Sequence, residues 1–318
     1  MPKHNTNKMQ MQSNKEHDRL HKRYKSKLEK SSTGWNFAMF ALVLSALFMI
    51  YPIISSLMLS TQSGKGVLYE FVGFGNIVRL VQDNNFWTAL KNTSIYFVFQ
   101  VPIMLTLALV IANMLNSKTL KGRGFFRTAI FLPCVTSLVA YSILFKSMFG
   151  ADGIVNSTLM AVNIINEPIA WLRDPFWAKV TVIVAITWRW TGYNMIFYLA
   201  GLQNIDPYLY EAADIDGASK TRQFFHITVP LLKPIIVYTA IMSTIGTLQL
   251  FDEVVNLTSG GASTPSLNAT MTLSQYIYDL SFKYVPNFGY AATVSLVVVV
   301  LIAILSLVQF KLAGDSNE

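Results

Sequence analysis

The feature that most constrains this chain is a series of apolar segments, each long enough to cross a lipid bilayer. A helix needs about 20 apolar residues to cross a hydrocarbon layer about 30 Å thick. Six segments meet this requirement: 35–59, 93–115, 128–149, 178–202, 235–255 and 290–310. The composition agrees, because 53% of the 318 residues are hydrophobic and only 13% are charged. The sequence therefore predicts an all-α, polytopic membrane protein with six transmembrane helices.

The distribution of lysine and arginine predicts how these helices are oriented. Basic residues near the ends of spans are retained in the cytoplasm. With the N-terminus inside, the cytoplasmic segments contain seventeen of them and the outer segments six. Both termini are therefore predicted to be cytoplasmic, with a basic tail, 1–34, and a six-helix domain, 35–318. The tail either rests on membrane lipid or, as the basic-residue distribution favours, serves only as a topology signal. This placement explains the net charge of +8 without nucleic-acid binding.

The charged loop 203–234 lies between the fourth and fifth predicted spans, on the cytoplasmic side. Asp206 and Pro207 form a strong helix start, because aspartate caps free N–H groups and proline at the first position sacrifices no helical bond. Gly217 can adopt the positive φ that ends a helix. A second helix is predicted over 219–227, after which two prolines change the chain direction before the fifth span.

The two helices of this loop could dock against another protein or could simply be solvated. Ala212 and Ala213 are small enough to permit close approach, and a buried Glu211 would require a cationic or N–H partner. In the second helix, Phe224 and Phe225 can dock against the inner ends of the spans, opposite a polar face that includes Gln223. Charged segments are more often solvated surfaces, so the residues alone leave both alternatives open.

A family resemblance favours docking. Glu211-Ala-Ala213, Gly217, Ile227 and Val229-Pro230 resemble the EAA motif of the permease subunits of ABC importers, with Val229 where the family usually has leucine. Further segments resemble the carbohydrate-importer branch: 73–76, 86–93, 122–128, 131–133, 170–172 and 199–203. Phe251-Asp-Glu253 and 257–261 resemble the maltose and glycerol-3-phosphate first-permease type, although Ala262 replaces its usual proline.

The resemblance implies the fold of type I ABC importer permeases in a bacterial inner membrane. It also implies partners: a second homologous permease, a dimer of ATP-binding subunits and an extracytoplasmic sugar-binding protein. The chain would not be an enzyme and would hold no cofactor, because ATP and Mg would be bound by the partner ATPase. Glu211, Ala212, Ala213, Gly217, Phe224 and Phe225 would couple the loop to that ATPase.

Polar residues within spans are costly unless they face a cavity or a partner, so they mark a candidate substrate path. They are Trp188, Arg189, Trp190, Tyr193, Asn194, Gln249, Asp252 and Glu253, with Gln100 a weaker candidate. Aromatic rings beside polar groups suit a sugar. Alternatively, Arg189 pairs with a carboxylate or with carbonyl groups to hold the bundle together.

Two other functions remain open. A secondary transporter coupled to ions could use Arg189, Asp252 and Glu253 as a relay. A membrane enzyme could use the two adjacent carboxylates, although neighbouring residues point apart on a helix. The four histidines and Cys134 show no metal-ligand spacing, so no metal site is predicted.

Overall fold

The computed structural model describes residues 35, 38–64, 69–117, 119–259 and 268–314. The predicted tail, 1–34, lies outside these residues. Contacts divide the chain into two units, residues 1–58 and 59–318. The first contains η1 (Ala46–Ile50) and most of α2 (Tyr51–Ser60). The predicted division into 1–34 and 35–318 stays a prediction.

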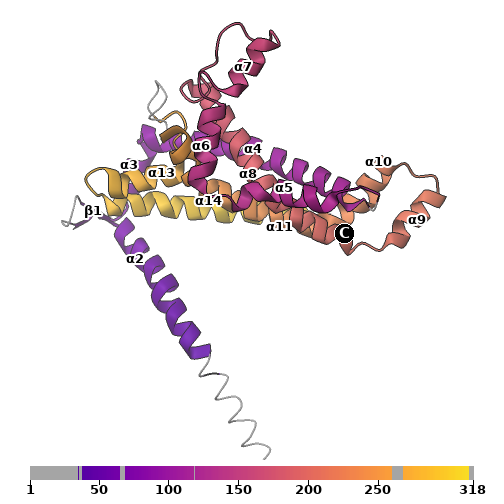
Figure 1. Cartoon of the computed structure of the whole chain (residues 1–318). Helices are drawn as coiled ribbons and strands as arrows, with labels where there is room; N and C mark the ends of the chain where they lie inside the picture. The colour runs from indigo at the N-terminus through magenta and orange to yellow at the C-terminus, as the bar shows by residue number, and fades with distance from the viewer. Residues whose placement is uncertain (1–34, 36–37, 65–68, 118, 260–267, 315–318) are drawn as a thin grey trace, which may run out of the picture. The chain divides into compact units, whose positions relative to one another are not determined.

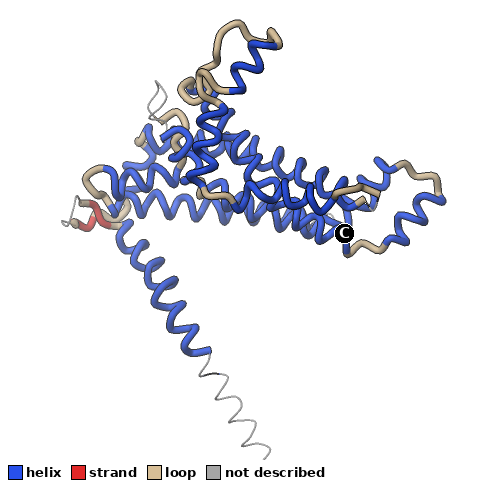
Figure 2. The backbone as a smooth tube through the Cα atoms, in the orientation of Figure 1, coloured by secondary structure: helices blue, strands red, loops and turns tan. Residues whose placement is uncertain are grey.

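The described residues of the second unit form helices joined by loops, together with one short β-hairpin (Figures 1 and 2). The hairpin pairs β1 (Gln62–Ser63) with β2 (Glu70–Phe71) in antiparallel register. The helices are α3 (Gly75–Val81), α4 (Asn84–Asn116), α5 (Arg123–Val135), α6 (Leu138–Met148), α7 (Ile154–Ala161), α8 (Pro175–Gln203), α9 (Pro207–Ile215), α10 (Lys220–Gln223), η2 (Phe224–Thr228), α11 (Val229–Leu248), α12 (Asp252–Thr258), α13 (Leu273–Tyr278), η4 (Asp279–Lys283) and α14 (Phe288–Gly314).

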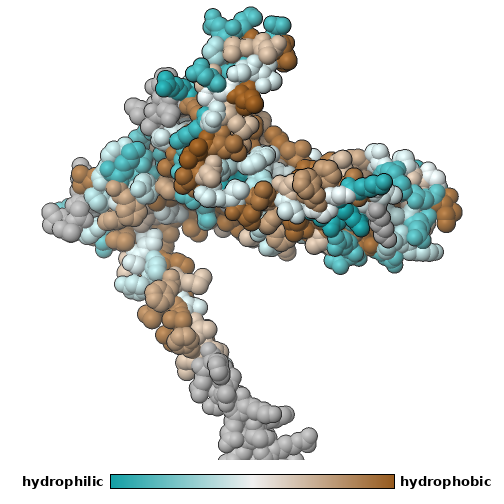
Figure 3. All heavy atoms as spheres, viewed as in Figure 1, coloured by the Kyte–Doolittle hydropathy of each residue, from teal (hydrophilic) through white to brown (hydrophobic). Residues whose placement is uncertain are grey.

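The long helices of this unit lie side by side and form a bundle. α8 packs against α4, α5 and α11, and α11 also packs against α14. Figure 1 places α9 and α10 at one end of the bundle and α3 and α13 at the other. On the face in Figure 3, apolar residues cover the middle of the bundle, and hydrophilic residues gather over α9, α10 and α7. This distribution suits a protein whose middle lies in lipid and whose ends lie in water.

Four helices among the described residues are long and apolar enough to cross a membrane: Ala38–Ser60, Asn84–Asn116, Lys220–Leu248 and Phe288–Gly314. The number becomes five if α5 and α6 are counted as one bent span. α8 has 29 residues but is not in this group. Its buried side chains include Arg189 and Asn194, which a helix can carry when other helices enclose it. The count of six spans and the location of the termini therefore stay predictions.

The third predicted span, 128–149, is not a continuous helix. α5 and α6 meet at an angle of 100°. The chain is extended at Thr136, the side chain of Ser137 accepts a hydrogen bond from the backbone N–H of Ala140, and Pro133 lies in the last turn of α5. Proline removes a helical hydrogen bond, and the serine cap stabilises a new start, so the chain changes direction here.

The fifth predicted span, 235–255, also has different boundaries. The helix starts earlier, at Lys220, and runs through Pro230 and Pro234 to Leu248. The π-helical turn η2, closed by a bond from Val229 N–H to the Phe224 carbonyl, leads into Pro230 without breaking the helix. Three non-helical residues then separate α11 from α12. The sequence predicted that these two prolines change the chain direction before the fifth span. This prediction is wrong, because the helix continues through both of them.

Close packing of α8 against α5 depends on one glycine. A Cβ atom at Gly192 would collide with the backbone carbonyl oxygen of Ile130. We expect Gly192→Ala to destabilise the protein by about 2 kcal/mol, because a backbone cannot yield as a side chain can. Gly246→Ala is the matched control, since its added methyl group meets no atom within 4 Å. Thermal unfolding in detergent should separate the two variants, and equal stability would contradict the close approach.

Candidate functional site

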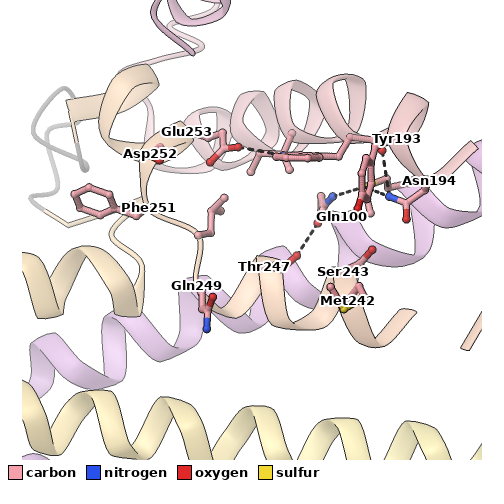
Figure 4. Close-up of a pocket in the computed structure, with 15 residues that line it drawn as sticks. Gln100, Tyr193, Asn194, Met242, Ser243, Thr247, Gln249, Phe251, Asp252 and Glu253 are labelled. Carbon is pink, nitrogen blue, oxygen red and sulfur yellow. Dashed lines mark hydrogen bonds between the residues drawn. The ribbon is translucent and has the colours of Figure 1, made fainter. Parts of the chain in front are cut away.

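A cavity of about 560 Å³ lies among α4, α8, α11 and the start of α12 (Figure 4). This volume falls within the range of about 300–1,000 Å³ that is usual for small-molecule sites. Six of the eight predicted substrate-path residues line it: Trp190, Tyr193, Asn194, Gln249, Asp252 and Glu253. The structure therefore brings together polar residues from two predicted spans.

The two other candidates, Trp188 and Arg189, do not line this cavity. Tyr193 and Asn194 lie three and four positions after Trp190, so they fall on the same side of α8 as Trp190. Trp188 faces α6 instead, where its ring stacks on Tyr141 at 6.2 Å between centroids. A run of consecutive helical residues must point in several directions, and only one of these directions is toward the cavity.

Arg189 does not line the cavity and instead connects α8 to neighbouring segments. Its Nε lies 4.0 Å from Oε1 of Glu253, and its Nη2 donates to the carbonyl of Thr136 at 3.4 Å. The guanidinium also lies 5.0 Å from the ring centroid of Tyr141. These contacts join α8 to α12 and to the break between α5 and α6. They match the alternative in which Arg189 pairs with a carboxylate and a carbonyl.

Gln100, Thr247 and Ser243 add polar groups to the cavity wall. The Thr247 hydroxyl donates to Oε1 of Gln100 at 3.1 Å, and Gln100 Nε2 donates to the Met104 sulfur, also at 3.1 Å (Figure 4). Asn194 Nδ2 lies 3.6 Å from the same sulfur. Asn194 Nδ2 also donates to the carbonyl of Trp190 at 3.1 Å. Thioether sulfur is a weak acceptor, so the hydrogen that each amide directs at it can still be donated to a solute. An amide inside an apolar span was the signal for Gln100, whereas threonine and serine are too common in helices to stand out.

The loop 203–234 has the predicted helix-turn-helix form. Asp206 caps α9 by accepting from the backbone N–H of Tyr208, and Pro207 is the first helical residue. Gly217 ends the helix region with φ of +73°. A Cβ at this position would meet no atom within 4 Å, so glycine is needed for its backbone conformation and not for space. Glu211 is exposed, and Ala212 and Ala213 are partly exposed on the same helix.

The second helix of the loop differs from the prediction in two ways. The Phe225 ring is 61% exposed, so it does not dock against the inner ends of the spans. Phe224 is only partly buried. Gln223, placed on the polar face by the sequence, is 3% exposed. The π-helical turn starts at Phe224 and changes which side chains face the bundle, which the 3.6-residue period could not anticipate.

A set of three side chains, which we call the loop brace, ties α9 to α10. Lys220 Nζ donates to Asp214 Oδ1 at 2.7 Å, and Gln223 Nε2 donates to the same oxygen at 2.5 Å. These two hydrogen bonds hold the pKa of Asp214 below its ordinary value. A lowered pKa stabilises the folded loop above the ordinary pKa of about 4, and that stabilisation is lost as the pH falls through the lowered value. The brace therefore stays charged at physiological pH.

We expect Asp214→Ala to loosen the loop brace without unfolding the bundle. Lys220 and Gln223 would lose their shared acceptor, and α9 would exchange its amide hydrogens several-fold faster. Asp216→Ala is the matched control, because Asp216 is an exposed neighbour with no side-chain hydrogen bond in the described loop. Hydrogen–deuterium exchange over 207–223 measures the difference. Equal exchange in both variants would show that the loop brace does not stabilise α9.

No group of three His, Cys, Asp or Glu side chains among the described residues is arranged to hold a metal ion. The chemistry of the cavity is therefore that of aromatic rings, amides, hydroxyls and two carboxylates. Such a wall can bind a polar solute.

Comparisons with known proteins agree with this picture. The family model described as "Binding-protein-dependent transport system inner membrane component" matches residues 73–313. The lactose transport system permease protein LacF of Rhizobium radiobacter is 60% identical over 282 residues, which are 89% of this chain and 94% of that protein. The arabinooligosaccharides transport system permease protein AraP of Bacillus subtilis is 37% identical over 270 residues, 84% of each.

A solved structure shows the same fold. It is that of a bacterial ABC transporter involved in the import of the acidic polysaccharide alginate, with a TM-score of 0.80 and 23% identity over 93% of this chain and 100% of that chain. The fold is thus the all-α fold of an ABC importer permease. The relatives are transport permeases and not enzymes. The chain belongs to the family of binding-protein-dependent transport system inner membrane components.

Proposed function

We propose that this chain is one of two membrane-spanning subunits of an ATP-driven importer for an oligosaccharide, with a disaccharide such as lactose as the first cargo to test. The observation that carries this proposal is the 60% identity to a lactose transport system permease over 94% of that protein's length. The cavity adds support, because Trp190 and Tyr193 offer rings for a sugar face beside amide and hydroxyl groups.

The proposed complex contains this chain, a second homologous permease, a dimer of ATPase subunits and an external sugar-binding protein. It lies in the inner membrane of a bacterium, with both termini in the cytoplasm. ATP and Mg bind to the ATPase subunits. The exposed face of α9, with Glu211 and the 87% exposed Ile215, docks on one of these subunits.

Coupling follows from the rigidity of the loop. The loop brace fixes α9 to α10, and a hydrogen bond of 2.9 Å between the hydroxyls of Tyr210 and Thr228 fixes α9 to η2. Because η2 leads directly into α11, a push on α9 is transmitted to a helix that lines the cavity. Such a push would shift the bundle between states that open the cavity to opposite sides.

Reconstitution into liposomes tests the proposal. The complex that copurifies with this chain, supplied with the binding protein and lactose, should take up lactose only when ATP is present on the cytoplasmic side. Uptake by this chain alone, driven by a proton or sodium gradient, would instead support the ion-coupled alternative in which Arg189, Asp252 and Glu253 form a relay.

A further inference from the structure

The ionisable groups on the cavity wall carry negative charge. Among the described residues that line the cavity, Asp252 and Glu253 are the acids, and none is lysine, arginine or histidine. Both acids lie at the start of α12, beside the non-helical segment that follows α11 (Figure 4). A solute in the cavity therefore meets carboxylates and no cationic side chain from the described lining residues.

Arg189, the cation paired with Glu253, is not among the residues that line the cavity. It is 9% exposed and lies between aromatic rings, 5.0 Å from the centroid of Tyr141 and 5.7 Å from that of Trp190. Its Nε lies 4.0 Å from Oε1 of Glu253, so the positive charge of Arg189 compensates the negative charge of Glu253. Trp190 Nε1 donates to the same oxygen at 3.1 Å and helps to hold the pair in place.

Asp252 has no such compensation. It is exposed on the cavity wall, and no ion pair of its side chain occurs among the described residues. The cavity therefore carries one carboxylate balanced by Arg189 and one that is not balanced. A like charge entering the cavity meets a repulsion that the partly apolar surroundings screen less than bulk water does.

An uncharged saccharide suits this wall. Its hydroxyls can donate to Asp252 and to the free oxygen of Glu253, and they can accept from the amides of Gln100 and Asn194. A saccharide with a carboxylate or phosphate group cannot donate from that group and would be repelled by Asp252. Repulsion of the wrong ligand is an effective source of specificity.

We infer that this chain's half of the pathway selects uncharged saccharides and rejects anionic ones, with Asp252 as the residue that sets this preference. The inference rests on the proposed function and narrows its substrate class. The fold does not decide the question, because a transporter with this fold imports the acidic polysaccharide alginate. The charge of the cavity side chains would determine whether a permease with this fold accepts anionic or uncharged saccharides.

A matched pair of probes tests the inference: galactobiose, which is uncharged, and digalacturonate, which differs by two carboxylates. Each is titrated into the purified complex without the binding protein, because the binding protein would impose its own selection. Binding is followed by fluorescence of Trp190, taken as the difference from a Trp190→Phe complex. The titrations are repeated for Asp252→Asn, Asp252→Lys and Glu167→Lys, the last being a matched charge change on an exposed residue that does not line the cavity.

We expect the wild type to bind digalacturonate at least about tenfold more weakly than galactobiose at low salt, with a smaller difference at high salt. Asp252→Asn should reduce the difference, Asp252→Lys should abolish or reverse it, and Glu167→Lys should leave it unchanged. Equal or tighter binding of digalacturonate by the wild type, or a difference unaffected by Asp252→Lys, would overturn the inference while the proposed function stands. If neither sugar binds to the wild type, the proposed sugar pathway itself is wrong.

Discussion

Replacing Glu211 by lysine should abolish ATP-driven uptake while the chain still inserts, folds and binds sugar. Glu211 is exposed on α9, and its side chain has no hydrogen bond or ion pair among the described residues. The fold therefore does not depend on it, whereas a partner groove built for a carboxylate would lose a charge-assisted hydrogen bond and meet a cation. Removal of such a bond from a buried position typically costs about 2–5 kcal/mol, which corresponds to a loss of affinity of roughly 30-fold or more.

Uptake of labelled lactose and copurification of the ATPase subunits measure this effect. Glu167→Lys makes the same charge change on an exposed loop away from α9 and should transport normally. Normal transport by Glu211→Lys would mean that the face of α9 containing this residue does not contact the ATPase.

Replacing Arg189 by leucine should destabilise the bundle by about 3 kcal/mol or more, because Glu253 would remain buried without its cation. The side chains of the two residues are only 11% and 10% exposed, so water can compensate little. The double variant Arg189→Leu, Glu253→Gln should recover most of this loss. It removes the unpaired charge and leaves an oxygen that can still accept from Trp190.

Thermal unfolding of the purified chain gives both values. If Arg189→Leu unfolds at the temperature of the wild type, the ion pair is not part of what holds α12 to α8. A double variant that is no more stable than Arg189→Leu would assign the loss to packing of the guanidinium between Tyr141 and Trp190 instead of to charge.

Local signals predicted much of the loop 203–234. The caps at Asp206 and Pro207 and the positive φ at Gly217 depend on residues close in sequence, so α9 and its end follow from local rules. The sequence did not reveal the loop brace, because Asp214 and Gln223 meet only after the chain folds back at Gly217. The π-helical turn at Phe224 likewise changes the exposed face of the second helix.

The lining of the cavity was predictable in part, from the composition of the spans. Polar residues inside apolar spans are few, so composition pointed to Trp190, Asn194 and their neighbours. Composition cannot give the rotation of α8, however, and that rotation places Arg189 outside the cavity. The breaks at Thr136 and after Leu248 depend on caps and on packing between distant segments. Hydropathy does not detect such breaks, so it predicted the single spans 128–149 and 235–255 where the structure has two helices each.

Accessibility of α9 tests the central claim most directly. Ile215 is 87% exposed at the end of this helix, and Cys134 is the only cysteine of the chain. A chain with Cys134→Ser and Ile215→Cys should react with a membrane-impermeant maleimide in inside-out vesicles after the ATPase subunits are stripped, and much more slowly in the intact complex. Labelling from the outer side, or equal labelling with and without the ATPase, would contradict the account that this loop is where the ATPase drives the permease.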